Sequence, residues 1–148
     1  MPHSLTDSAV LVDDSAALLP LDPDRLDCYR VAVEFQVLAS TLLPTTQRVL
    51  RDQLDRASVS IVLNISEGCG RRARRDKARF YAMARGSAME CAAIVNLALV
   101  RDLAPYLDCR RGRSLLVRLV QMLTKLQITM RGRLDGNGRD TCTSTAKV

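Results

Sequence analysis

Six cationic side chains are concentrated in one short run near the middle of the chain. Residues 71–79 read RRARRDKAR, and Asp76 is the one acidic residue among Arg71, Arg72, Arg74, Arg75, Lys77 and Arg79. Guanidinium and ammonium groups at such density attract phosphate and other anions. The run follows a glycine-containing turn and begins a predicted helix, whose first backbone N–H groups would add donors for phosphate. We therefore predict an anion-binding surface here.

A solvated helix face is the simpler interpretation of the same run. The helix dipole is positive at this end, however, and disfavours cations there. A purely structural sequence more often places Asp or Glu in a first helical turn. The unfavourable placement of so many cations therefore favours an anionic partner.

A second set of cations is predicted on the last helix. Arg111, Arg118 and Lys125 are spaced by seven residues, which places them on one helix face. Aromatic residues make up only 3% of the chain, so base stacking is not expected, and contacts should be to phosphates and sensitive to salt. The candidate nucleic-acid-binding residues are Arg71, Arg72, Arg74, Arg75, Lys77, Arg79, Arg111, Arg118 and Lys125.

The residue types that catalysis and metal binding require are scarce. The chain has a single histidine, His3, and no nucleotide-binding glycine motif. Glu67 and Glu90 are the two glutamates of the second and third predicted helices, and the Glu-x-x-His element of di-metal bundles is missing. The five cysteines form no CxxC pair, so no zinc site is indicated. We expect no enzymatic activity, no cofactor and no metal.

The charge of the chain is unevenly distributed. The net charge is +6, but residues 1–25 carry five Asp and one Arg, whereas residues 26–131 carry 18 Lys and Arg against nine Asp and Glu. We predict a flexible acidic arm over 1–25, one domain over 26–131 and a disordered tail over 132–148. Reduced cysteines, no signal-peptide pattern and no long apolar run favour a cytoplasmic protein that does not span a membrane.

Four segments repeat apolar residues at alternating spacings of three and four, which is typical of helices. With short loops, they predict an all-α, antiparallel up-down-up-down four-helix bundle. Residues 57–65 are apolar on more than one face, which indicates either self-association or a wide core stripe. The expected core stripes are Cys28, Val31, Phe35, Leu38 and Leu42; Leu50, Leu54, Ala57, Ile61 and Asn64; Phe80, Ala84, Ser87, Cys91, Ile94 and Ala98; and Leu115, Leu119, Met122 and Leu126.

Prolines and glycines suggest where these helices end. We expect Pro44 and Pro105 to end the first and third helices, and Gly68 and Gly70 to end the second in the left-handed conformation. The fourth helix should stop near Arg131, before Gly132. The expected N-terminal caps are Thr45 or Thr46 for the second helix and Asp108 for the fourth.

Polar residues on the second and third helices should face one another if the chain folds back near residues 72–73. Such a hairpin pairs residues whose numbers add to about 146, and a close backbone approach is expected at Gly86. The facing polar residues either fix the packing and register of the two helices or line a ligand pocket around Asn64 and Glu90. The predicted pairs are Arg56 with Glu90, Ser60 with Gly86, and Glu67 with Arg79.

Two stretches of this hairpin resemble a known family. RASVSIVLNISEGCGRR and RFYAMARGSAMEC are similar to the R-A-x-S-I-x-x-N-I-x-E-G-x-G-R and A-R-G-S-x-x-E patterns of bacterial four helix bundle proteins, which include those encoded in 23S ribosomal RNA intervening sequences. The likeness covers roughly residues 26–131. The matching polar and glycine positions are Arg56, Ser60, Asn64, Glu67, Gly68, Gly70, Arg71, Arg85, Gly86, Ser87 and Glu90.

The resemblance implies a four-helix bundle that assembles into a homopentamer, and no enzymatic activity is established for the family. More distant accessory proteins of diversity-generating retroelements share the architecture and bind nucleic acid and a reverse transcriptase. One departure is Ala73, which stands where the family often has a Ser or Thr cap. The acidic arm lies outside the likeness, and its charge would allow it to occupy the basic surface.

Two functions remain open at this point. The first is a cytoplasmic, oligomeric bundle that binds RNA or DNA through its basic surface, as an accessory factor in a ribonucleoprotein or of a reverse transcriptase. The second is a protein-interaction scaffold, whose arginine-rich face docks an acidic partner or the protein's own N-terminal arm.

Overall fold

The computed structural model describes the backbone of residues 21–135, which form helices and no strand, and the side chains of residues 21–132. The prediction of an all-α, four-helix protein is confirmed. Residues 1–20 of the predicted arm and 136–148 of the predicted tail lie outside the described residues. In chain order the elements are η1 (Asp22–Arg25), α1 (Asp27–Leu42), η2 (Thr45–Gln47), α2 (Arg48–Gly70), α3 (Arg74–Val100) and α4 (Tyr106–Asp135).

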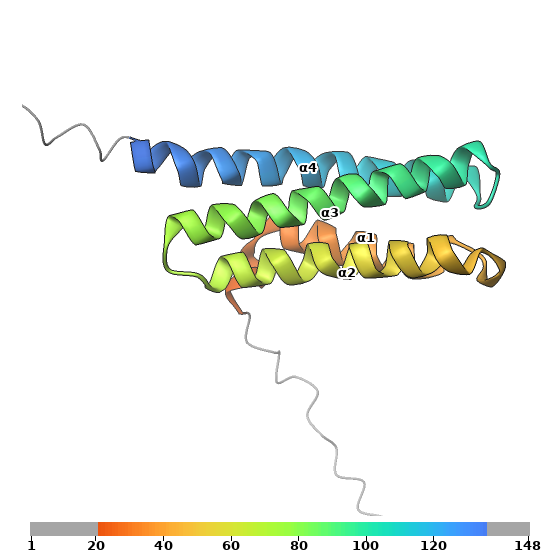
Figure 1. The fold of residues 1–148 in the computed structure, drawn as a ribbon, viewed down its shortest axis with the longest axis horizontal. Coiled ribbons are helices and arrows are strands. Elements are labelled where there is room, and N and C mark those ends of the chain that lie inside the picture. Colours follow the sequence, from red (N-terminus) through yellow and green to blue (C-terminus); the bar gives the residue numbers. More distant parts are fainter. Residues whose placement is uncertain (1–20, 136–148) are drawn as a thin grey trace, which may run out of the picture.

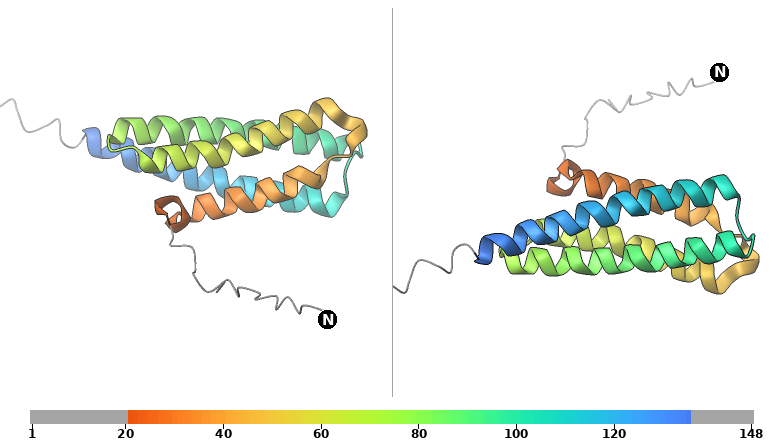
Figure 2. Two further views of the ribbon diagram at one scale, coloured as in Figure 1. Left: turned by 90° about the horizontal axis from the view of Figure 1, so that it is seen from below. Right: turned by 90° about the horizontal axis from the view of Figure 1, so that it is seen from above.

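The four α-helices lie side by side along one long axis (Figures 1 and 2). Helix α3 packs against α2 and α4, and α1 packs against the same two helices from the other side of the core. The α2–α3 connection, η1 and the end of α4 all lie at one end of the molecule, and the other two connections lie at the opposite end (Figure 1). Residues of the central basic run therefore share one end with the last turns of α4.

The predicted apolar stripes form the core. Cys28, Phe35, Leu54, Ile61 and Leu119 are all buried, and the larger cluster around them draws on all four helices. Seven members of the predicted stripes are only partly buried. These half-buried members are Leu38, Leu50, Asn64, Phe80, Ser87, Met122 and Leu126.

The glycines at the end of α2 act differently from the prediction. Helix α2 runs through Gly68 to Gly70, and no glycine among the described residues has a positive φ. Instead, Gly68 allows α2 and α3 to approach closely. A Cβ atom there would lie 2.9 Å from Cε1 of Tyr81 and 3.0 Å from Cβ of Phe80. Among the described residues, positive φ occurs at Asp102, with φ of 52°, in the turn after α3.

The predicted caps are also absent. Thr45 and Thr46 belong to η2, and α2 begins after Gln47 without a side-chain cap. Helix α4 begins at Tyr106, so Asp108 lies inside its first turn, where an acidic side chain suits the positive end of the helix dipole. Helix α4 continues through Gly132 to Asp135.

Helix α3 is long and apolar enough to span a membrane, with a mean hydropathy of 1.3 over its most apolar window. Core helices of soluble proteins have the same property, and α3 contacts both α2 and α4 along the bundle. Its length and composition alone are therefore weak evidence for a membrane span.

Candidate functional site

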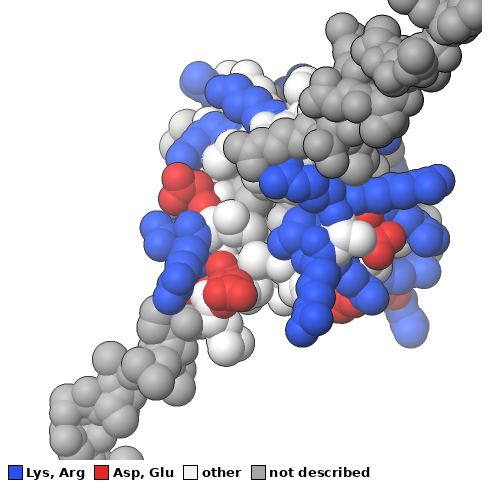
Figure 3. Space-filling view, turned by 90° about the vertical axis from the view of Figure 1, so that its left-hand side faces the viewer, with Lys and Arg blue, Asp and Glu red and all other residues white. Residues whose placement is uncertain are grey.

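The cations of residues 71–79 gather where α2 meets α3, beside the last turns of α4. We call this surface the basic end and define it as Arg71, Arg72, Arg74, Arg75, Lys77 and Arg79 together with Arg131 of α4. Figure 3 looks onto this end of the molecule and shows Lys and Arg side chains gathered on it, with smaller patches of Asp and Glu between them.

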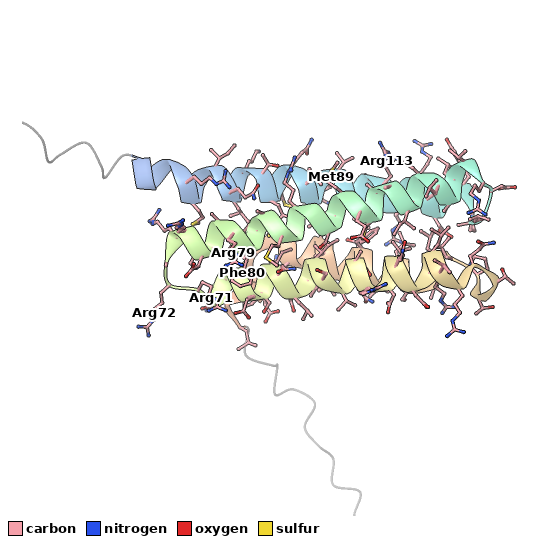
Figure 4. The ribbon with its side chains drawn as sticks, viewed as in Figure 1. Arg71, Arg72, Arg79, Phe80, Met89 and Arg113 are labelled. Carbon is pink, nitrogen blue, oxygen red and sulfur yellow. The ribbon has the colours of Figure 1, made fainter. Side chains whose placement is uncertain are left out.

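Two of these cations hold the α2–α3 turn together. Arg71 forms an ion pair with Glu67 one helical turn earlier, and its guanidinium carbon lies 5.0 Å from the ring centre of Phe80 (Figure 4). Lys77 Nζ donates to the carbonyl oxygen of Cys69 at 2.9 Å. Glu67 thus has Arg71, directly after α2, as its ion-pair partner, and no ion pair joins it to the predicted neighbour Arg79 among the side chains described.

Arg74 occupies the first position of α3, directly after Ala73. As the sequence indicates, Ala73 provides no side-chain cap for this helix start. One guanidinium nitrogen of Arg74, Nη1, is buried and has no hydrogen-bond partner among the side chains described for residues 21–132 or the described backbone. A buried donor without a partner is energetically unfavourable, so a hydrogen-bond acceptor bound to Arg74 Nη1 would stabilise this helix start.

Three cations of the run face solvent without a carboxylate partner. Arg72, Arg75 and Arg79 are exposed, and none of them takes part in an ion pair within the described part of the chain. Arg72 extends beyond the α2–α3 turn, away from the helices (Figure 4). These three side chains are the ones available to an anion.

Arg131 is a member of the basic end that the sequence analysis missed. It lines one hollow together with Arg75 and Arg79, between the start of α3 and the end of α4. Two contacts fix the register of this helix pair: Arg113 Nη1 donates to Asn96 Oδ1 at 2.6 Å, and Arg85 Nε donates to Thr124 Oγ1 at 3.1 Å. Extending that register toward the helix ends would have placed Arg131 beside Arg79.

The predicted cations of α4 form a separate stripe. Arg111 and Lys125 are two heptads apart, which corresponds to about 21 Å along a helix at 1.5 Å per residue. Arg111 Nη2 lies 3.0 Å from Glu34 Oε1 of α1, so part of its charge is neutralised within the chain. Arg118 and Lys125 are exposed and form no ion pair among the residues described. The structure thus does not bring Arg111 into one cluster with residues 71–79.

The polar motif between α2 and α3 is real, but its partners differ from the prediction. Ser60 Oγ lies 3.0 Å from Ser87 Oγ, and Asn64 Nδ2 donates to the Ser60 carbonyl oxygen at 2.9 Å and to Ser60 Oγ at 3.0 Å. The predicted neighbour Gly86 is exposed, and a Cβ atom there would meet no atom within 4 Å. The hairpin register is close to the predicted one, because the numbers of Ser60 and Ser87 add to 147 and the connection spans residues 71–73; the predicted close approach at Gly86 is wrong.

The predicted pairing of Arg56 with Glu90 is absent. Both side chains are exposed, and no ion pair joins them in the described structure. Arg85 is likewise exposed rather than buried, with Thr124 as its partner. A hollow of about 480 Å³ does adjoin Asn64, but Glu90 is not part of its wall, which consists of Asp55, Arg56, Val59, Ser60, Leu63 and Asn64.

The core cysteines have the properties of small apolar residues. Burial raises the pKa of the Cys28 thiol to about 11 and that of the Cys91 thiol to about 12, and it also raises the pKa of Cys109. Because a thiolate is the reactive form, these thiols are poor nucleophiles near neutral pH.

Comparison with known proteins agrees with the hairpin motifs. No curated protein matches the chain. The model of a family described as 23S rRNA-intervening sequence protein matches residues 25–125, which include α1, α2, α3 and most of α4. Since the match covers more than half of the sequence, the chain belongs to the 23S rRNA-intervening sequence protein family.

Proposed function

We propose that this protein binds the phosphate backbone of nucleic acid through its basic end, as an accessory factor in a ribonucleoprotein or of a reverse transcriptase. The observation that carries the proposal is the group of exposed arginines, Arg72, Arg75 and Arg79, that no carboxylate of the described chain neutralises. The family's name associates it with a ribosomal RNA intervening sequence, which supports RNA as the first polymer to test.

Binding should depend on charge far more than on sequence. The described chain has few aromatic side chains, and Phe80 at the basic end already contacts Arg71. Arg71 and Lys77 have partners within the chain, so Arg72, Arg75, Arg79 and Arg131 are the main phosphate contacts. Each phosphate contact contributes about 0.7 to the slope of log K against log salt for single strands and about 0.9 for duplexes. With these four contacts, the slope of log K against log salt for one subunit should be roughly 3 to 4 in magnitude. This is smaller than the slope expected if all six cations of residues 71–79 contacted phosphates.

The assembly that we propose is an up-down-up-down bundle in a homopentameric ring. It is supported by apolar side chains on the outside of the bundle, such as Val59 and Leu63 on α2, of which Leu63 is 62% exposed. A further apolar groove of about 370 Å³ lies between α3 and α4, with Met89 in its wall (Figure 4). A ring would repeat the basic end several times and strengthen weak phosphate contacts by avidity.

We further propose that the protein is non-enzymatic and works in the cytoplasm without a cofactor. Free, buried thiols at Cys28, Cys91 and Cys109 suit a reducing compartment. Their raised pKa values also argue against a nucleophilic role.

The test is a titration of labelled RNA and DNA oligonucleotides at two salt concentrations. We expect binding that weakens steeply as salt rises and that is lost in an Arg72→Glu/Arg75→Glu variant. The matched control is Arg101→Glu/Arg110→Glu, which changes the net charge equally near the opposite end of the bundle and should retain binding. If the wild-type protein binds neither polymer at low salt, the proposal fails and the interaction scaffold becomes the better explanation.

A further inference from the structure

A hollow of about 720 Å³ lies at the basic end, between the first turns of α3 and the last turns of α4. This volume is within the range of roughly 300–1,000 Å³ that is usual for small-molecule sites. Its wall combines charged and small side chains, namely Arg75, Asp76, Ala78, Arg79, Ala82 and Arg131.

The charge of this hollow is unbalanced. Among the side chains described, three guanidinium groups line it against the single carboxylate of Asp76, and that carboxylate forms no ion pair with any of them. Like charges that share a hollow repel one another, and an anion between them removes that repulsion. The wall is thus suited to a ligand that carries negative charge.

The geometry also suits a particular kind of anion. Two arginines come from α3 and one from α4, so the donors approach from two sides of the hollow. Planar guanidinium groups donate paired hydrogen bonds to the oxygens of phosphate, which can accept from several arginines at once. Ala78 and Ala82 contribute no bulk beyond a methyl group, so the space between the arginines stays open.

We propose that this hollow is a phosphate-binding site in which Arg75, Arg79 and Arg131 hold one phosphate group between α3 and α4. The proposal rests on the proposed function, since the phosphodiester backbone of RNA is the first source of such a group. Free phosphate offers the same chemistry, and the experiment separates the two. The site goes beyond a general basic surface because it requires an open hollow and a residue of α4.

Two variants test the two requirements separately. Arg131→Gln removes the α4 donor, and its control is Arg101→Gln, which removes one exposed cation from the opposite end. Ala82→Leu fills the hollow and leaves every charge in place. RNA affinity is measured by fluorescence anisotropy, stabilisation by inorganic phosphate is measured by thermal unfolding, and the helical circular dichroism signal checks the fold of each variant.

We expect Arg131→Gln and Ala82→Leu each to weaken RNA binding roughly tenfold relative to Arg101→Gln, the loss of about one charge-assisted contact. The salt slope should fall by about 0.7 in Arg131→Gln. If RNA binds but both variants behave like Arg101→Gln, the phosphate site is refuted and the proposed function stands. If Ala82→Leu does not fold, Arg131→Gln alone decides the matter.

A different result would separate the site from the polymer. If the wild-type protein does not bind RNA but inorganic phosphate stabilises it, and Arg131→Gln abolishes this effect, the hollow is a site for free phosphate and the proposed function fails. If neither RNA nor inorganic phosphate binds the wild-type protein, both proposals are overturned.

Discussion

The backbone of Gly68 lies against the ring of Tyr81, so close that a Cβ atom would stand 2.9 Å from Cε1. Tyr81 is buried, and its ring cannot move away without disturbing the contact between α2 and α3. We expect Gly68→Ala to destabilise the protein by about 1–3 kcal/mol, the usual effect of overpacking a core. Urea unfolding measures the change.

Gly86 provides the matched control for that substitution. It lies in the interior of α3, and a Cβ atom there meets nothing within 4 Å. In a single subunit, Gly86→Ala should therefore stabilise the helix by about 0.5–1 kcal/mol. Equal effects of the two alanine variants would contradict the close approach at Gly68.

The contact between Ser60 and Ser87 links α2 to α3 through side chains that are half-buried. Replacing Ser87 by alanine leaves Ser60 Oγ with Asn64 as its remaining partner, so we expect a loss of about 1 kcal/mol. A double-mutant cycle with Ser60→Ala isolates the pair. Coupling near zero would mean that the two hydroxyl groups do not interact in solution.

The acidic arm should reduce the affinity for nucleic acid. Residues 1–20 contain three Asp and no Lys or Arg, and η1, which closely follows them, lies at the same end as the α2–α3 turn (Figure 1). Deletion of residues 1–20 should raise RNA affinity roughly two- to tenfold at low salt, because a tethered negative charge competes with phosphate. The full-length chain with Asp7→Asn, Asp13→Asn and Asp14→Asn is the control for charge, and unchanged affinity in both would exclude this competition.

Stability should fall at alkaline pH because of the buried thiols. The pKa of Cys28 is raised from 9.0 to about 11 and that of Cys91 to about 12 by burial, so the unfolded chain loses its thiol protons first. Their contribution is complete below pH 9.0 and is lost as the pH rises through the folded-state values. Urea midpoints at about pH 8 and about pH 10.5 measure the drop, which should be smaller in Cys91→Val. An equal drop in that variant would assign the effect to other groups.

Self-association should depend on the apolar groove between α3 and α4. Met89 is 51% exposed there, beside Ala92, Ala93, Val117 and Val120. We expect the wild-type protein to have a mass several times the 16.4 kDa of one chain by light scattering, and Met89→Glu to lower it, because an assembled interface would bury the charge. Tyr106→Glu, at an exposed site on α4, is the control, and a monomeric wild-type protein would refute the ring.

Apolar spacing was sufficient to predict the helices and most of the core, because burial follows the helical period directly. Leu54, Ile61 and Leu119 were all placed correctly. Boundaries were less predictable, since a glycine at a helix end can either adopt positive φ or allow close packing. Gly68 does the second, and the choice depends on Tyr81, which a local pattern does not reveal.

The candidate site could be predicted only in part. Charge density found Arg72, Arg75 and Arg79, which are indeed exposed. It could not tell them from Arg71, because the partner of Arg71 depends on how far α2 extends past Glu67. Arg131 was missed because it reaches the site only through the way α4 is aligned against α3. That alignment could not be worked out without knowing that α4 begins at Tyr106.

Helix η1 near the start of the described chain and the last turns of α4 both lie at the end of the molecule that carries the arginines (Figure 1). A tag joined directly to residue 21 or to residue 135 would therefore lie next to that surface. A polyanionic tag would mimic the ligand, and a bulky one would obstruct it. A label used for measuring affinity is therefore best placed at the opposite end of the bundle, where the α1–α2 and α3–α4 connections lie.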